Sequence, residues 1–370
     1  MSTSAQLKRA DTAETRPLVS VVMPCFNVAS TLSCAYKSLR AQSYEHFEAL
    51  CVDDGSLDTT WEVLQDLAAH DRRLRVFHQE NKGPSAARNH ALAQARGEII
   101  MFLDADDELV PEAIERVVSV FMHTNCEVFS FGFDACPLEF APQTMIDLAT
   151  PSDSEFYGFS SQLMFHEAAR PFGVRTSLSR AFVEREHIRF DESCGLGEDQ
   201  VFFFSIYPRS KKTVLKPWHL YRYNLREASF AHGLHKESAR SSKISSHIKV
   251  LQAIVADWKG SSWFCAAQDE LFSWMCDFLL FDLAQADASI QKHACEVLVD
   301  LVRTSFPDGF SPKGILERRL FLKIQAVAAS QSSRGLRYTD LVFFYLARRG
   351  LRACILRVLH KLLGKSSYAA

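Results

Sequence analysis

The chain has 370 residues, of which 47% are hydrophobic and 23% charged, and a formal net charge of −2 at pH 7. This composition excludes a disordered or fibrous chain, and the length predicts two domains or one large domain with a helical appendage. No apolar stretch approaches the roughly 18–20 residues that span a bilayer. The ten cysteines form no Cys-x-x-Cys pair, which argues against a zinc site and favours reduced, buried thiols in a cytosolic protein.

After a polar segment at residues 1–16, expected to be a disordered tail, strands and helices are predicted to alternate. Apolar runs predict strands at residues 18–23, 47–52, 73–77 and 99–103, and helical spacing predicts helices at 30–42, 58–67 and 85–95. This alternation indicates right-handed βαβ units. The predicted fold class is therefore α/β, with a mainly parallel sheet flanked by helices.

Polar residues follow three of these strands where each strand ends. The first strand ends in Pro24-Cys25-Phe26-Asn27, the second in Asp53-Asp54, and the fourth in Asp104-Ala105-Asp106-Asp107. Because the carboxyl ends of parallel strands form the ligand-binding edge of a sheet, these residues are expected to converge. A divalent ion with oxygen ligands would neutralise the repelling carboxylates of the last motif. The alternative is a solvated acidic turn before a helix that Pro111 helps to start.

Four motifs occur in order between residues 19 and 107. They read Val-Ser-Val-Val-Met-Pro-Cys-Phe-Asn at 19–27, Val-Asp-Asp-Gly-Ser-Leu-Asp at 52–58, Asn-Lys-Gly-Pro-Ser-Ala-Ala-Arg-Asn at 81–89 and Phe-Leu-Asp-Ala-Asp-Asp at 102–107. Together they resemble the family 2 inverting glycosyltransferases, which have the GT-A fold, and above all bacterial members that build capsules, exopolysaccharides or O-antigens. The resemblance implies a GT-A domain over residues 17–235.

The resemblance implies a nucleotide-sugar donor, with a UDP-sugar favoured, and Mg²⁺ or Mn²⁺ as cofactor. Asp106 is implied as the main metal ligand, Asp104 as a contact to ribose or metal, and Asp107 as a second ligand. Either Asp53 or Asp54 would bind the base. The residues implied to bind the nucleotide-sugar are Pro24, Phe26, Asn27, Asp53, Asp54, Arg88, Asp104 and Ser229.

Two of these residues have simple structural alternatives. Phe26 stands where the family often has tyrosine, and it could stack on the base or pack in the core. Arg88 resembles a family arginine near the base or diphosphate, and its alternative is a surface charge on a helix.

Ser229 lies in a segment that approaches the diphosphate in the family. His232 or His235 could complete a metal shell, although a lone histidine is more often a surface residue.

Glu198-Asp199 is expected at the start of a helix that contains the apolar run 201–206. By resemblance Asp199 is the general base that takes the proton from the acceptor hydroxyl. The alternative is that both residues only stabilise the first turn of the helix through its dipole. The acceptor is implied to be a glycan or a lipid-linked glycan. No Gln-x-x-Arg-Trp motif is present, which favours addition of single sugars over polymerisation.

Two other classes of protein are alternatives to this enzyme. One is a non-catalytic scaffold subunit that keeps the nucleotide-sugar pocket, although intact Asp104, Asp106 and Asp199 favour an enzyme. The other is a nucleotidyltransferase, which would be expected to have a glycine-rich basic loop after the first strand, where this chain has Pro24-Cys25-Phe26-Asn27.

Residues 236–370 are predicted to be helical, with helices at 237–257, 265–285, 290–304, 312–330 and 338–362. From residue 311 onward, 12 lysines and arginines stand against Glu317 and Asp340. A basic amphipathic helix suits an anionic membrane surface, which predicts a cytoplasmic protein bound peripherally to the inner face of the cell membrane. Packing against the acidic catalytic domain or a dimer contact is the alternative. No nucleic-acid-binding motif accompanies the basic region, so nucleic acid is not an expected partner.

Overall fold

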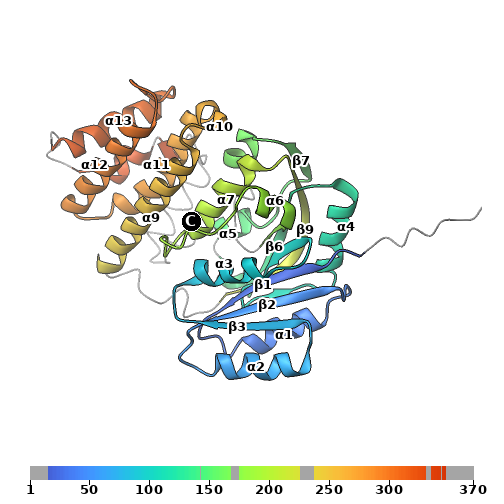
Figure 1. Cartoon of the computed structure of the whole chain (residues 1–370). Helices are drawn as coiled ribbons and strands as arrows, with labels where there is room; N and C mark the ends of the chain where they lie inside the picture. Colours follow the sequence, from blue (N-terminus) through green and yellow to red (C-terminus); the bar gives the residue numbers. More distant parts are fainter. Residues whose placement is uncertain are drawn as a thin grey trace, which may run out of the picture.

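A computed structural model of the chain describes residues 16–141, 143–167, 175–225, 237–330, 335–342 and 344–346. A nine-stranded sheet runs through the first part of the chain, with helices on both faces, and a group of helices follows it (Figure 1). The main path of the sheet has the strand order β3-β2-β1-β4-β8-β6-β9-β5, and β7 pairs with β9. The predicted α/β class is confirmed.

The first half of the sheet is parallel. Its elements are β1 (Val19–Cys25), α1 (Leu32–Arg40), β2 (Phe47–Asp54), α2 (Thr60–His70), β3 (Leu74–Gln79), α3 (Pro84–Gln94) and β4 (Ile99–Phe102). β1 pairs with β2 and β4, and β2 pairs with β3. All the strands and helices predicted for this half are confirmed to within a few residues. The carboxyl ends of β1, β2 and β4 therefore meet at one edge.

The second half of the sheet is mixed. Its elements are β5 (Glu108–Leu109), α4 (Ala113–Thr124), β6 (Val128–Cys136), η1 (Leu138–Phe140), α5 (Gln143–Asp147), β7 (Ser154–Tyr157), η2 (Gln162–His166), β8 (Thr176–Ser179), α6 (Arg180–Arg185), α7 (Glu198–Arg209) and β9 (Lys212–Asn224). β8 lies antiparallel between β4 and β6, while β9 is parallel to β6 and antiparallel to β5 and β7. The unbroken run of parallel pairs predicted for the sheet thus ends at β4, and in this half only the pairing of β6 with β9 is parallel among the described strands.

The described part of the C-terminal region is largely helical, as predicted. Its helices are α9 (Glu237–Trp258), α10 (Ser262–Ala266), α11 (Gln268–Leu283), α12 (Ala288–Ser305) and α13 (Ile315–Ala328). The helix expected at 265–285 corresponds to α11, and the first two residues of that range belong to α10. Of the helix expected at 338–362, residues 338–342 and 344–346 are helical and the remainder lies outside the described residues. No helix in the described part of the chain is long and apolar enough to cross a membrane.

Some predictions fall on residues that the structure does not describe. These are the disordered tail, apart from Arg16, and the site residues Ser229, His232 and His235. The nine described cysteines are free thiols, and six of them are buried as expected, whereas Cys34, Cys136 and Cys265 are exposed, contrary to the expectation.

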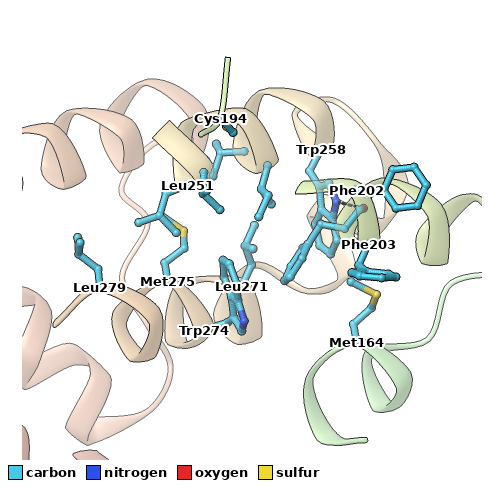
Figure 2. Close-up of a cluster of buried hydrophobic side chains, with 14 of the residues drawn as sticks. Met164, Cys194, Phe202, Phe203, Leu251, Trp258, Leu271, Trp274, Met275 and Leu279 are labelled. Atoms are coloured by element: carbon cyan, nitrogen blue, oxygen red, sulfur yellow. Dashed lines mark hydrogen bonds between the residues drawn. The ribbon is translucent and has the colours of Figure 1, made fainter. Parts of the chain in front are cut away.

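The hydrophobic core on the α3 face of the sheet continues into the helical region. Figure 2 shows Phe202 and Phe203 of α7 together with Trp258 of α9 and Trp274 of α11. All four side chains are buried. The indole Nε1–H of Trp258 donates a 2.8 Å hydrogen bond to the backbone oxygen of Phe204. α7 is therefore packed on one side by the sheet and on the other by the helical region.

Candidate functional site

A cleft of about 340 Å³ opens at the carboxyl ends of β1, β2 and β4. Six of the predicted site residues line it: Pro24, Phe26, Asp54, Arg88, Asp104 and Asp106. Asn81, Gly83 and Pro84 also line the cleft. Sequence reasoning did not single these three out, although they belong to the third motif. The structure thus brings together residues that are up to 82 positions apart in the chain.

Phe26 and Asn27 follow β1 and have different surroundings. Phe26 is 44% exposed on the cleft wall, so the alternative that it packs in the core is wrong. Asn27 does not line the cleft. Its backbone N–H donates to the hydroxyl of Ser56 at 3.0 Å, and its Oδ1 accepts from the Leu57 N–H at 2.8 Å. Asn27 therefore joins the loops that follow β1 and β2.

Asp54 shapes the cleft wall through backbone contacts. Its carboxylate accepts hydrogen bonds from the backbone N–H groups of Lys82 and Gly83 at 2.9 and 2.8 Å, and from Nε2 of Gln79 at 2.8 Å. These bonds fix the segment that leads into α3, and Gly83 and Pro84 of that segment line the cleft. A carboxylate can accept about four hydrogen bonds, so Asp54 retains capacity for a ligand.

Asp53 is fully buried and does not line the cleft. Its Oδ2 lies 2.7 Å from Nδ1 of His78, while Oδ1 has no hydrogen-bond partner among the described residues. Of the two aspartates predicted as alternatives for base binding, Asp54 is therefore the one in contact with the cleft.

The acidic motif after β4 divides into two parts. Asp104 and Asp106 line the cleft, whereas Asp107 is buried and directed toward β9. Asp107 accepts hydrogen bonds from the Tyr221 hydroxyl and the Asn224 backbone N–H, both at 2.7 Å. Burial, with the nearby charge of Asp106, raises the pKa of Asp107 to about 8. Asp107 thus holds β9 against the motif, and this geometry gives no support to its predicted role as a second metal ligand.

The donor set of the cleft suits a hard divalent ion that also binds a diphosphate. Among the described residues, no three His, Cys, Asp or Glu side chains form a metal-binding group. Mg²⁺ commonly takes only one or two protein carboxylates, because waters and substrate phosphates complete its shell. The cleft lining contains two such carboxylates close in sequence, Asp104 and Asp106.

Arg88 joins the cleft to the start of α7. Its guanidinium pairs with Oδ1 of Asp104 and with Oε1 of Glu198, both at 3.0 Å. Only 12% of its side chain is exposed, so the alternative of a surface charge is wrong. Burial opposes the charge of Arg88, but the two carboxylates outweigh burial and raise the pKa of the guanidinium. Glu198 was not predicted as a contact of Arg88, and its place in the Glu198-Asp199 motif was the one available signal.

Asp199 lies in the first turn of α7, outside the lining of the cleft. Its Oδ1 accepts a 2.8 Å hydrogen bond from the Gln200 N–H. Burial and the charge of Glu198 raise the pKa of Asp199 to about 6, although the Gln200 hydrogen bond and Arg88 act in the opposite direction. Such a carboxylate is ionised at neutral pH and is basic enough for proton transfer.

The turn before Asp199 depends on glycine. Gly197 is the N-cap of α7 and has a φ of +85°, which side chains disfavour. A Cβ at this position would also lie 3.1 Å from Cγ2 of Val250 in α9. The helical region therefore packs directly against the turn that presents Asp199.

Known proteins resemble the part of the chain that carries these residues. Residues 20–181 match the sequence model of the family described as Glycosyl transferase family 2. An uncharacterized glycosyltransferase of Haemophilus influenzae is 29% identical over 234 residues, which cover 63% of this chain and 85% of the relative. The succinoglycan biosynthesis protein ExoO of Rhizobium meliloti is 28% identical over 220 residues, which cover 58% of this chain. That alignment spans 63% of ExoO, less than two thirds of its length.

Solved structures share the fold over most of the chain. The crystal structure of S. aureus TarS 1–349 in complex with UDP-GlcNAc is 20% identical with a TM-score of 0.69, covering 84% of this chain and 88% of TarS 1–349. The mannosyltransferase PcManGT from Pyrobaculum calidifontis, in complex with GDP-Man and Mn²⁺, is 19% identical with a TM-score of 0.52. The match covers 86% of this chain and 87% of PcManGT. With the four motifs assembled at one cleft, residues 20–181 form a glycosyl transferase family 2 domain, and the chain has the GT-A fold that it shares with these solved structures.

Proposed function

We propose that this protein is a metal-dependent inverting glycosyltransferase. It moves one sugar from a nucleotide-sugar, with a UDP-sugar favoured, to a hydroxyl of a glycan or lipid-linked acceptor in the synthesis of a cell-surface polysaccharide. The observation that carries the proposal is the cleft at the strand ends, because it combines Phe26, Asp54, Asp104 and Asp106 in one donor-sized space. The description of ExoO as a succinoglycan biosynthesis protein supports a role in polysaccharide synthesis. The UDP-GlcNAc bound to TarS supports a nucleotide-sugar donor.

The residues of the cleft have complementary roles in holding the donor. The exposed ring of Phe26 offers a stacking surface for the base, and Asp54 offers an acceptor to a base N–H. Asp106 and Asp104 would hold Mg²⁺ or Mn²⁺, with Mn²⁺ in the related mannosyltransferase as support. When bound, the ion would neutralise the charge that develops on the departing diphosphate.

Asp199 acts on the acceptor in this proposal. Its ionised carboxylate takes the proton of the acceptor hydroxyl while that oxygen bonds to the anomeric carbon from the side opposite the diphosphate. The bond between the anomeric carbon and the diphosphate oxygen breaks, so the products are an inverted glycoside and a nucleoside diphosphate. Arg88 contacts both Asp104 and Glu198. It therefore fixes the position of the general base Asp199 relative to the donor cleft.

Asp106→Ala is expected to abolish most metal-dependent release of nucleotide, because the variant removes a carboxylate from the metal-binding wall. The measurement is nucleotide released from a panel of UDP-, GDP- and TDP-sugars, with Mn²⁺ or with a chelator. Asp66→Ala is the matched control, since Asp66 is a 75% exposed carboxylate on α2, remote from the cleft. Donor binding without release, across varied acceptor glycans, would instead favour a non-catalytic scaffold subunit.

The rate of transfer is expected to fall about tenfold per pH unit below pH 6, at saturating donor and Mn²⁺. Asp199 must be ionised to accept a proton, and its pKa is raised to about 6, so activity rises with pH through that value and then levels off. Glu198→Gln should move this limb to lower pH, because the charge of Glu198 raises the pKa of Asp199. If the pH dependence of the transfer rate is unchanged in that variant, the titrating group is a residue other than Asp199.

A further inference from the structure

The helix α13 has apolar residues on two opposite faces. Leu320, Phe321 and Ile324 are buried in the core. On the other side, Ile315 is 82% exposed and Leu322 is 61% exposed. Residues seven apart lie on the same face of a helix, so these two side chains form one exposed apolar stripe. α13 lies at the outer edge of the helical region (Figure 1), which leaves this face accessible in the described part of the chain.

Cationic side chains border this stripe. Arg318 and Arg319 are exposed and lie three or four residues from both Ile315 and Leu322, within one helical turn of each. The one acidic residue of α13, Glu317, lies two positions from Ile315 and therefore points to a different side of the helix. The outward face of α13, meaning Ile315, Arg318, Arg319 and Leu322, is thus apolar along its centre and positively charged at its borders.

We propose that the outward face of α13 binds an anionic phospholipid surface. Ile315 and Leu322 enter the boundary between headgroups and acyl chains, while Arg318 and Arg319 contact headgroup phosphates. A lipid surface fits this pattern because it presents an anionic layer directly above an apolar one. A stable protein partner normally covers about 800 Å² on each side, which two aliphatic side chains between arginines do not provide.

The test is flotation of the full-length protein with vesicles of phosphatidylcholine, with and without phosphatidylglycerol. Binding is expected only to the anionic vesicles, and to weaken as salt is raised. Arg318→Gln/Arg319→Gln should reduce the partition coefficient about 25-fold at low salt, or about fivefold per arginine. Ile315→Ser/Leu322→Ser should reduce it at least about tenfold, because each buried methylene group contributes to the partition.

Lys292→Gln/Arg303→Gln on α12 is the matched control, because it also removes two exposed cations. This control should bind like the natural protein, and an equal loss in it would contradict a contact specific to α13. Normal binding by both α13 variants would also overturn the proposal, as would no binding by the natural protein. So would concentration-dependent dimerisation that the α13 variants abolish, which would assign the face to a second copy.

This inference is independent of the proposed glycosyl transfer. All four substituted α13 residues are exposed, and Arg318 Nε donates one long hydrogen bond of 3.2 Å to the backbone oxygen of Pro312, so the variants should melt within a few degrees of the natural protein. Release of nucleotide measured without vesicles should also be unchanged in them. Failure of flotation with normal nucleotide release would therefore reject the membrane face alone, while flotation without any release would reject the proposed activity alone.

Discussion

Asp199→Asn is expected to lower kcat by a factor of roughly 10²–10⁴ while the affinity for the nucleotide-sugar is kept. An asparagine amide has nearly the shape of the carboxylate but cannot take a proton. Asp199 does not line the donor cleft, so donor binding should survive. The measurement is kcat with saturating substrates, together with the Kd for the donor by calorimetry.

Asp191→Asn is the matched control for this variant. Asp191 is a carboxylate in the loop that precedes α7, where it accepts hydrogen bonds from the backbone N–H and the hydroxyl of Ser193 at 2.8 and 2.6 Å. Its amide variant should retain kcat within a few-fold. Normal turnover in Asp199→Asn would remove Asp199 as the base, and a parallel loss of donor binding would indicate a structural role.

Trp258→Ala is expected to lower the free energy of unfolding by about 3–5 kcal/mol. Trp258 is fully buried between the sheet region and the helical region. Its ring lies 5.4 Å from that of Phe204 in α7 and 5.9 Å from that of Phe159. Removal of the indole would leave a cavity at this shared core and would also lose the hydrogen bond to Phe204. The measurement is denaturant unfolding followed by fluorescence and circular dichroism.

Trp258→Phe should cost much less, since most of the ring remains and a single hydrogen bond contributes about 0.5–1.5 kcal/mol. Because one core contacts both regions, the two optical signals are expected to change together in a single transition. Two separate transitions, of which only the one for unfolding of the helical region is sensitive to Trp258, would show that the sheet region and the helical region fold independently.

The sequence alone determined the local elements and the composition of the donor cleft. Short apolar runs bounded by turn residues define β1, β2 and β4, because strand formation at these positions depends on neighbouring residues. Once the strands are parallel, their carboxyl ends must lie together, so the sequence by itself predicts that Asp54 and Asp104 lie at one edge of the sheet. The order of the motifs added Arg88 and Asp199, whose roles spacing does not encode.

Only the tertiary structure decided which way these side chains point and what they contact. Arg88 pairs with Glu198, which lies 110 positions further along the chain. Asp107 points away from the cleft and accepts a hydrogen bond from Tyr221, which lies 114 positions further along. The mixed half of the sheet and the packing of Trp258 on α7 have the same origin. These features arise from contacts between distant residues, whose geometry depends on how whole elements pack, and hydrophobic patterns within single elements carry no information on that packing.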